Sequence, residues 1–123
     1  MLGPDTSPVT PISEINLMND KPVILINVFT VDPERQLELI ELLTRATEDS
    51  VRHARGFMSA RLHRSLDGTK VTMYAQWRTN VDYQAMRENP APLPYLQRAL
   101  AIAKFEPGMY EVVQTFSPPG TNA

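Results

Sequence analysis

The chain contains no cysteine, only two histidines and one tryptophan among its 123 residues. The absence of cysteine excludes disulfides, thiolate catalysis and metal sites ligated by sulfur. Twelve basic and fourteen acidic residues give a formal net charge of -2, so the chain lacks the basic surface that a nucleic-acid partner requires. The longest apolar run, Val23 to Ile26, is far shorter than the roughly 20 residues of a membrane span. We therefore expect a cytoplasmic protein with neither membrane nor nucleic acid as a partner.

The length is that of a single domain, and both of its ends are rich in proline. Residues 1–21 place Pro4, Pro8 and Pro11 among polar residues, and bury too little apolar surface to offset the entropy of ordering. We predict a flexible N-terminal arm at 1–21, a folded domain at 22–117 and a C-terminal tail at 118–123. A few apolar residues in the arm leave open that it packs on a partner subunit.

Hydrophobic patterns predict the order strand, helix, strand, strand, helix, strand. The predicted strands are residues 22–31, 57–66, 69–77 and 108–117, and the predicted helices are about 32–54 and 81–104, the second one interrupted by prolines at 90 and 92. This βαββαβ order is typical of the ferredoxin-like α+β fold, an antiparallel sheet with both helices on one face. Because the other face then stays bare, we expect a homodimer that packs sheet to sheet.

Two patterns predict which side chains face the core. In the long helix the apolar stripe consists of Leu37, Ile40, Leu43 or Thr44, Thr47 and Val51. In the second strand, the face better suited to a core consists of Met58, Ala60, Leu62, Arg64 and Leu66.

The stretch from Val71 to Tyr83 combines a strand, a sharp turn and the start of a helix. Strand alternation places Met73 and Trp77 on one face and Tyr74 on the other. Thr79 is a suitable N-cap, which puts Tyr83 about one turn into the following helix. Trp77 and Tyr83 are either core aromatics or the walls of a space between sheet and helix.

Asn27 is the one polar residue in the middle of the first strand. Either a neighbouring loop or water satisfies its amide, or the amide is a donor and acceptor placed in an apolar pocket. His53 and His63 are the only imidazoles, and their spacing gives no metal-ligand pattern. Phosphate-binding loops, nucleophile elbows and dinucleotide fingerprints are absent.

Three groups of residues together resemble the antibiotic biosynthesis monooxygenase family: Ile26 to Val31, Gly56-Phe57, and Tyr74 to Trp77 with Tyr83. The resemblance extends over roughly residues 23–116 and is closest to the small anthrone and naphthacenone oxygenases of aromatic polyketide pathways. It implies a dimeric α/β barrel with a pocket in each subunit. It also implies that molecular oxygen oxidises a polycyclic phenol or anthrone to a quinone, with no flavin, haem or metal as cofactor.

By the same resemblance, Asn27 and Trp77 match the catalytic positions. The expected substrate-binding residues are Tyr83, Met73, Phe29 and Tyr74. Family oxygenases often carry a second asparagine where this chain has Met73, and haem-degrading members need a histidine on the second helical segment, where residues 79–104 contain none. Two alternatives to the oxygenase interpretation stay open: a non-catalytic ligand-binding or accessory protein, and a polyketide cyclase or isomerase that uses the same pocket.

Overall fold

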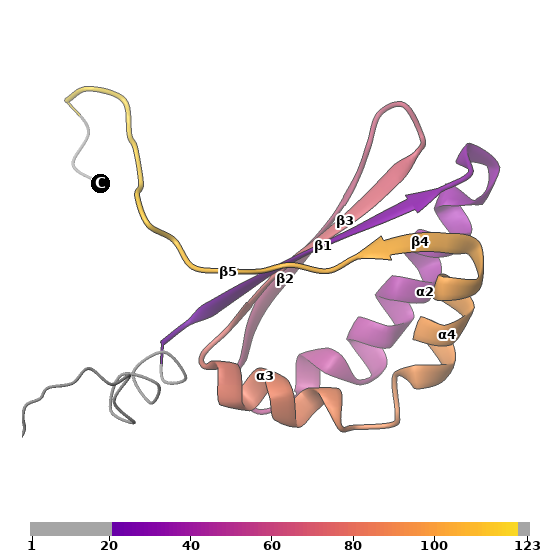
Figure 1. Ribbon diagram of the computed structural model, residues 1–123, viewed down its shortest axis with the longest axis horizontal. Coiled ribbons are helices and arrows are strands. Elements are labelled where there is room, and N and C mark those ends of the chain that lie inside the picture. Colours follow the sequence, from indigo (N-terminus) through magenta and orange to yellow (C-terminus); the bar gives the residue numbers. More distant parts are fainter. Residues whose placement is uncertain (1–20, 121–123) are drawn as a thin grey trace, which may run out of the picture.

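The strands form one antiparallel sheet whose inner face is covered by helices (Figure 1). The computed structural model describes residues 21–120, so the predicted N-terminal arm, apart from Lys21, lies outside the described residues. The strands are β1 (Val23–Val31), β2 (Phe57–Arg64), β3 (Lys70–Trp77), β4 (Ala103–Glu106) and β5 (Met109–Tyr110). The helices are η1 (Pro33–Arg35), α2 (Gln36–Asp49), η2 (Val51–His53), α3 (Asn80–Arg87) and α4 (Leu93–Ile102).

The order of strands in the sheet is β2-β3-β1-β4, with β5 also paired to β1. This order confirms the predicted ferredoxin-like α+β arrangement, with antiparallel pairing throughout and the helices on one face. Within residues 21–120 no helix combines the length and the apolar character needed to cross a membrane.

Cross-strand partners build the inner face of the sheet. Asn27 of β1 lies opposite Met73 of β3, and this pair separates two clusters of buried apolar residues. One cluster contains Phe29, Val31, Leu39, Leu42, Leu43, Val71 and Ala99, and the other contains Val23, Leu25, Ala75 and Trp77. The apolar core is therefore divided at the position where the first strand carries its amide.

The inner stripe of the long helix follows the prediction except in its first turn: Ile40 and Leu43 belong to the core, and Thr47 and Val51 line the space beneath the sheet. The buried residues of α2 are Gln36, Leu39, Leu42, Leu43 and Ala46. Leu37 is exposed, so its predicted place on the inner stripe is wrong. The reason lies in the first turn, where Nε2 of Gln36 donates hydrogen bonds to the carbonyls of Ser65 (3.2 Å) and Lys70 (3.0 Å). These bonds fix Gln36 against the β2–β3 hairpin and turn Leu37 outward.

Strand β2 contains a β-bulge that its sequence pattern does not reveal. The register with β3 shifts between Phe57 and Ser59, so Phe57 and Ala60 both pack against the buried cluster around Trp77. Met58, Arg64 and Leu66 are exposed, and their predicted place in the core is wrong, whereas Ala60 and Leu62 pack on the core as predicted.

The last strand forms earlier in the chain than the predicted range of 108–117. Helix α4 ends at Ile102, and β4 begins at the next residue and pairs with β1. The ring of Phe105 stacks on that of Phe29 with centroids 4.8 Å apart, an apolar contact that holds β4 beside β1. Residues 111–117 have no strand partner within the described chain and run away from the body of the molecule (Figure 1).

Candidate active site

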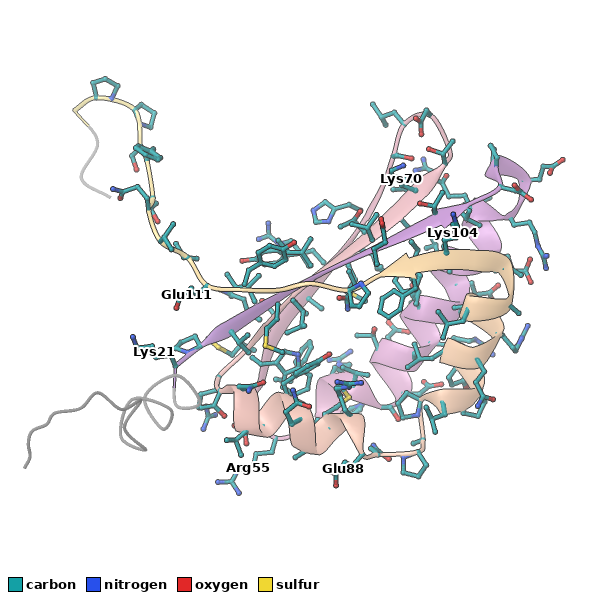
Figure 2. All side chains as sticks on the ribbon, viewed as in Figure 1. Lys21, Arg55, Lys70, Glu88, Lys104 and Glu111 are labelled. Atoms are coloured by element: carbon teal, nitrogen blue, oxygen red, sulfur yellow. The ribbon has the colours of Figure 1, made fainter. Side chains whose placement is uncertain are left out.

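A cavity of about 370 Å³ lies between the inner face of the sheet and the helices, in the layer where their side chains meet in Figure 2. This volume falls in the range of roughly 300–1,000 Å³ that is usual for small-molecule sites. Most of its twenty lining residues are aliphatic or aromatic. The lining residues with polar side-chain groups are Asn27, Thr47, Trp77, Tyr83 and Arg87. Such a cavity suits a largely apolar ligand that is oriented by a few polar contacts.

Asn27 reaches the cavity from the centre of β1, at the gap between the two core clusters. Its Oδ1 accepts a hydrogen bond of 3.4 Å from the backbone N–H of Gly108, which follows β4. Because the Gly108 N–H can only donate, the Asn27 carbonyl oxygen must face it, and the NH₂ group is left for another partner. The described residues provide none for Nδ2. The cavity therefore contains an amide donor whose orientation the fold determines.

Trp77 ends β3 on the same face of the sheet and is only 1% exposed. Its ring meets Phe57 edge-on, with centroids 5.4 Å apart, and Tyr83 at 5.7 Å. A buried indole N–H normally has a hydrogen-bond acceptor. Within residues 21–120 the Trp77 indole N–H has none. Trp77 also lines the cavity, so its N–H is a second candidate donor for a ligand bound there.

Tyr83 is placed by the cap of α3. The Thr79 hydroxyl accepts a hydrogen bond of 3.1 Å from the backbone N–H of Asp82, which confirms the predicted N-cap. Tyr83 then follows on the first turn and joins Trp77 at the cavity. Burial raises the pKa of the Tyr83 phenol above its ordinary value of 10.0, and the Arg87 guanidinium offsets part of that rise. The phenol therefore stays protonated at neutral pH and can donate a hydrogen bond.

The other predicted binding residues divide into two groups. Met73 and Phe29 line the cavity, Met73 directly beside Asn27 on the neighbouring strand. Tyr74 does not line it, because strand alternation turns this residue to the outer face of the sheet. The predicted role of Tyr74 as a binding residue therefore has no support from its position.

Two polar lining residues were not predicted as site residues, although Thr47 was placed on the inner stripe of its helix. Arg87 lies one helical turn after Tyr83 on α3, so the 3.6-residue period of that helix was the available signal. Thr47 of α2 donates its hydroxyl proton to the carbonyl of Leu43 at 2.8 Å and leaves its oxygen lone pairs for an additional donor.

Neither histidine belongs to the cavity. Nε2 of His53 lies 2.9 Å from the backbone carbonyl of Glu48, at the exposed end of the long helix. His63 is exposed on β2. Within the described part of the chain, no three His, Asp or Glu side chains are grouped so that they hold a metal ion. No Asp, Glu or His belongs to the described residues that line the cavity.

Comparison with known proteins gives one family. Residues 22–95 match the family described as Antibiotic biosynthesis monooxygenase. The chain is 42% identical over 99 residues to Tetracenomycin-F1 monooxygenase of Streptomyces glaucescens. This similarity covers 78% of the chain and 88% of that protein.

Two solved structures are similar to this one over most of the chain. ActVA-Orf6 of Streptomyces coelicolor, a monooxygenase solved in complex with nanaomycin D, is 26% identical with a TM-score of 0.70. The match covers 80% of this chain and 94% of that one. SnoaB, a cofactor-independent oxygenase from Streptomyces nogalater, is 24% identical with a TM-score of 0.70. The match covers 80% of this chain and 99% of the SnoaB chain. At this identity SnoaB supports the fold alone.

Proposed function

Because this chain belongs to the antibiotic biosynthesis monooxygenase family, we propose that it is a monooxygenase that oxidises a polycyclic aromatic phenol or anthrone to a quinone with molecular oxygen. Its similarity to Tetracenomycin-F1 monooxygenase supports the reaction type, and the complex of ActVA-Orf6 with nanaomycin D supports a fused-ring ligand. One observation carries the proposal: Asn27, Trp77 and Tyr83 line the same largely apolar cavity of about 370 Å³.

The reaction balances without any redox group from the protein. Conversion of the CH₂ group of an anthrone to a carbonyl removes four electrons from the substrate, and O₂ accepts four electrons when one of its atoms enters the quinone and the other becomes water. The step begins when the substrate loses a proton to give an electron-rich anion. This anion transfers one electron to O₂, the two radicals combine to a peroxide, and loss of water leaves the new carbonyl. No external reductant is needed, which is consistent with our expectation that the enzyme works without a flavin, haem or metal.

The protein's part in this chemistry is to stabilise the substrate anion. A hydrogen bond to the charged form of an acid lowers the pKa of that acid. We assign this role to the Nδ2 donor of Asn27, which is held in place by the Gly108 N–H, and we assign a supporting role to the indole N–H of Trp77. Since no described lining residue is a carboxylate or imidazole, the proton leaves to water rather than to a protein base. Tyr83 and Phe29 position the rings.

Oxygen uptake tests this function directly. With anthrone in buffer treated with a chelator, we expect the protein to consume one O₂ per anthrone and to form anthraquinone at a rate well above spontaneous oxidation. Excess chelator should leave the rate unchanged. An uptake rate no higher than the spontaneous one, for a series of anthrones and quinols that bind to the cavity, would contradict the proposal.

Met73 favours a second candidate, a ligand-binding or accessory protein that uses the same cavity. Met73 lies directly opposite Asn27, and its thioether offers no hydrogen-bond donor to a substrate oxygen. A binding protein would retain a fused-ring ligand and consume no oxygen. A cyclase or isomerase would change its substrate under nitrogen as readily as in air, so the same assay separates all three functions.

A further inference from the structure

Arg87 is the one charged residue among the described residues that line the cavity. It lies in the last turn of α3, with its guanidinium carbon 6.0 Å from the centre of the Tyr83 ring. This distance places the cation over an aromatic face, where it is attracted weakly and held close to the cavity. The oxidation proposed above uses no positive charge at this position.

No protein carboxylate neutralises this guanidinium. The ion pairs within residues 21–120 are those of Arg35 with Glu38 and of Arg55 with Asp82, so no described carboxylate lies within 4.0 Å of Arg87. The next residue, Glu88, points away from the layer between sheet and helices (Figure 2). The cavity therefore carries one uncompensated positive charge.

The residues around Arg87 define where this charge acts. Arg87 is exposed, as are the apolar lining residues Leu93, Leu100 and Phe105 of α4 and β4. These four residues form the rim of the cavity, while the buried Leu25, Ala75 and Trp77 form its inner wall. A ligand that fits both regions has an apolar ring system inside and an anionic group at the rim.

From this arrangement we propose that Arg87 binds a carboxylate substituent of the aromatic substrate and so selects acidic ring systems over neutral ones. The guanidinium fork matches the two oxygens of a carboxylate and forms two charge-assisted hydrogen bonds. Arg87 is thus a specificity-determining residue remote from the reacting carbon. This inference rests on the proposed function only for the identity of the ring system.

Binding of stable quinones tests the inference without any turnover. Anthraquinone-2-carboxylate and 2-(hydroxymethyl)anthraquinone differ in charge but little in size, and quenching of Trp77, the only tryptophan, reports their binding. We expect the wild-type protein to bind the carboxylate about tenfold or more tightly than the alcohol, and this preference to weaken as the salt concentration rises. In Arg87→Gln the ratio of the two dissociation constants should fall to about one.

Arg98→Gln is the matched control, because Arg98 is an exposed arginine of α4 that does not line the cavity. It should keep the wild-type ratio. A wild-type protein with no preference, or an Arg87→Gln variant that keeps it, would overturn the inference. If the preference depends on Arg87 but no anthrone is oxidised, the inference stands and the proposed oxidation fails. If anthrone is oxidised but the protein shows no preference for the carboxylate, the proposed oxidation stands and the inference about Arg87 fails.

Discussion

The hydrogen bond from the Gly108 N–H to Oδ1 of Asn27 determines which end of the amide faces the cavity. The proposed mechanism requires the NH₂ end there, because only a donor stabilises a developing oxyanion. Asn27→Asp tests the donor end alone. Its carboxylate can still accept the hydrogen bond from Gly108, but it presents an oxygen instead of an NH₂ group to the substrate. We expect both Asn27→Asp and Asn27→Ala to lower kcat for anthrone oxidation by more than tenfold.

Thermal melting and circular dichroism of the two Asn27 variants serve as the controls for folding. If Asn27→Asp were well folded and kept wild-type turnover, the donor role would be refuted. If Asn27→Ala lost activity while Asn27→Asp kept it, the residue would be needed for shape or for the Gly108 contact rather than for its N–H.

Asp67, at the tip of the β2–β3 hairpin, gives a pH prediction. Its Oδ1 accepts hydrogen bonds from the backbone N–H of Thr69 (3.0 Å), the Thr69 hydroxyl (2.7 Å) and the Ser65 hydroxyl (2.7 Å), and these lower its pKa from 3.8 to about 2. A depressed pKa in the folded state stabilises the fold above pH 3.8, and this contribution is lost as the pH falls toward 2. We expect the Asp67 carboxyl carbon to titrate near 2 in NMR spectra. A midpoint at or above 3.8 would contradict the hydrogen-bonded turn.

Single residues differed in how far the sequence determined their role. Strand period alone predicts that Met73 and Trp77 share a face, and the structure confirms this shared face, on which both line the cavity with Asn27. Arg87 was not predicted as a site residue, because basic residues are common in the last turn of a helix, where they interact favourably with the helix dipole. Its significance depends on which carboxylates lie nearby, and that depends on the tertiary structure.

At the scale of elements, Gly56 determines how closely η2 approaches α3. Its φ of +85° is unfavourable for other residues, and a Cβ there would overlap the side chain of Asp82. The Gly56 carbonyl also accepts a hydrogen bond of 2.7 Å from the N–H of Arg78. Gly56→Ala should lower the free energy of unfolding by about 1–3 kcal/mol, measured by urea denaturation.

Gly120 supplies the matched control for Gly56. Its φ is +84°, but nothing lies within 4 Å of the position of a Cβ. Gly120→Ala therefore has the backbone cost of a positive φ without the steric clash, and should lower the free energy of unfolding by about 1 kcal/mol at most, less than Gly56→Ala does. Equal stability of the two variants would show that contact with Asp82 does not limit this junction.

Elements whose boundaries depend on local sequence signals were predictable. Elements whose boundaries depend on pairing with distant parts of the chain were not. The start of α3 follows from Thr79, whose side chain caps the helix in the structure. The bulge at Phe57 and the early start of β4 depend on pairing with β3 and β1. The inward position of Gln36 in the first turn of α2 depends on its bonds to a hairpin about thirty residues later. Local propensity contains none of these long-range contacts.

At the scale of the whole molecule, the helices cover only one face of the sheet (Figure 1). Ile26, Val28 and Tyr74 lie on the other face, which no helix within residues 21–120 covers. Val113 and Phe116 are each 85% exposed in the segment that leaves the body after β5. Apolar side chains on an uncovered sheet face, next to an exposed apolar segment, are typical of an interaction surface. This arrangement supports our expectation of a homodimer in which the outer faces of two sheets pack together.

Sedimentation tests this expectation with the full chain. We expect the wild-type protein to have the mass of two chains of 13.9 kDa each. We place Val113 and Phe116 of the exposed segment at this interface as well. The double variant Val113→Asp with Phe116→Asp should therefore shift the mass toward one chain, because burial of two new carboxylates in an apolar interface is costly. The control, Gln114→Asp with Thr115→Asp, adds the same charge at neighbouring polar positions and should remain dimeric. A wild-type monomer at micromolar concentration would refute the dimer. If both double variants dissociated equally, added charge rather than loss of apolar contact would explain the dissociation.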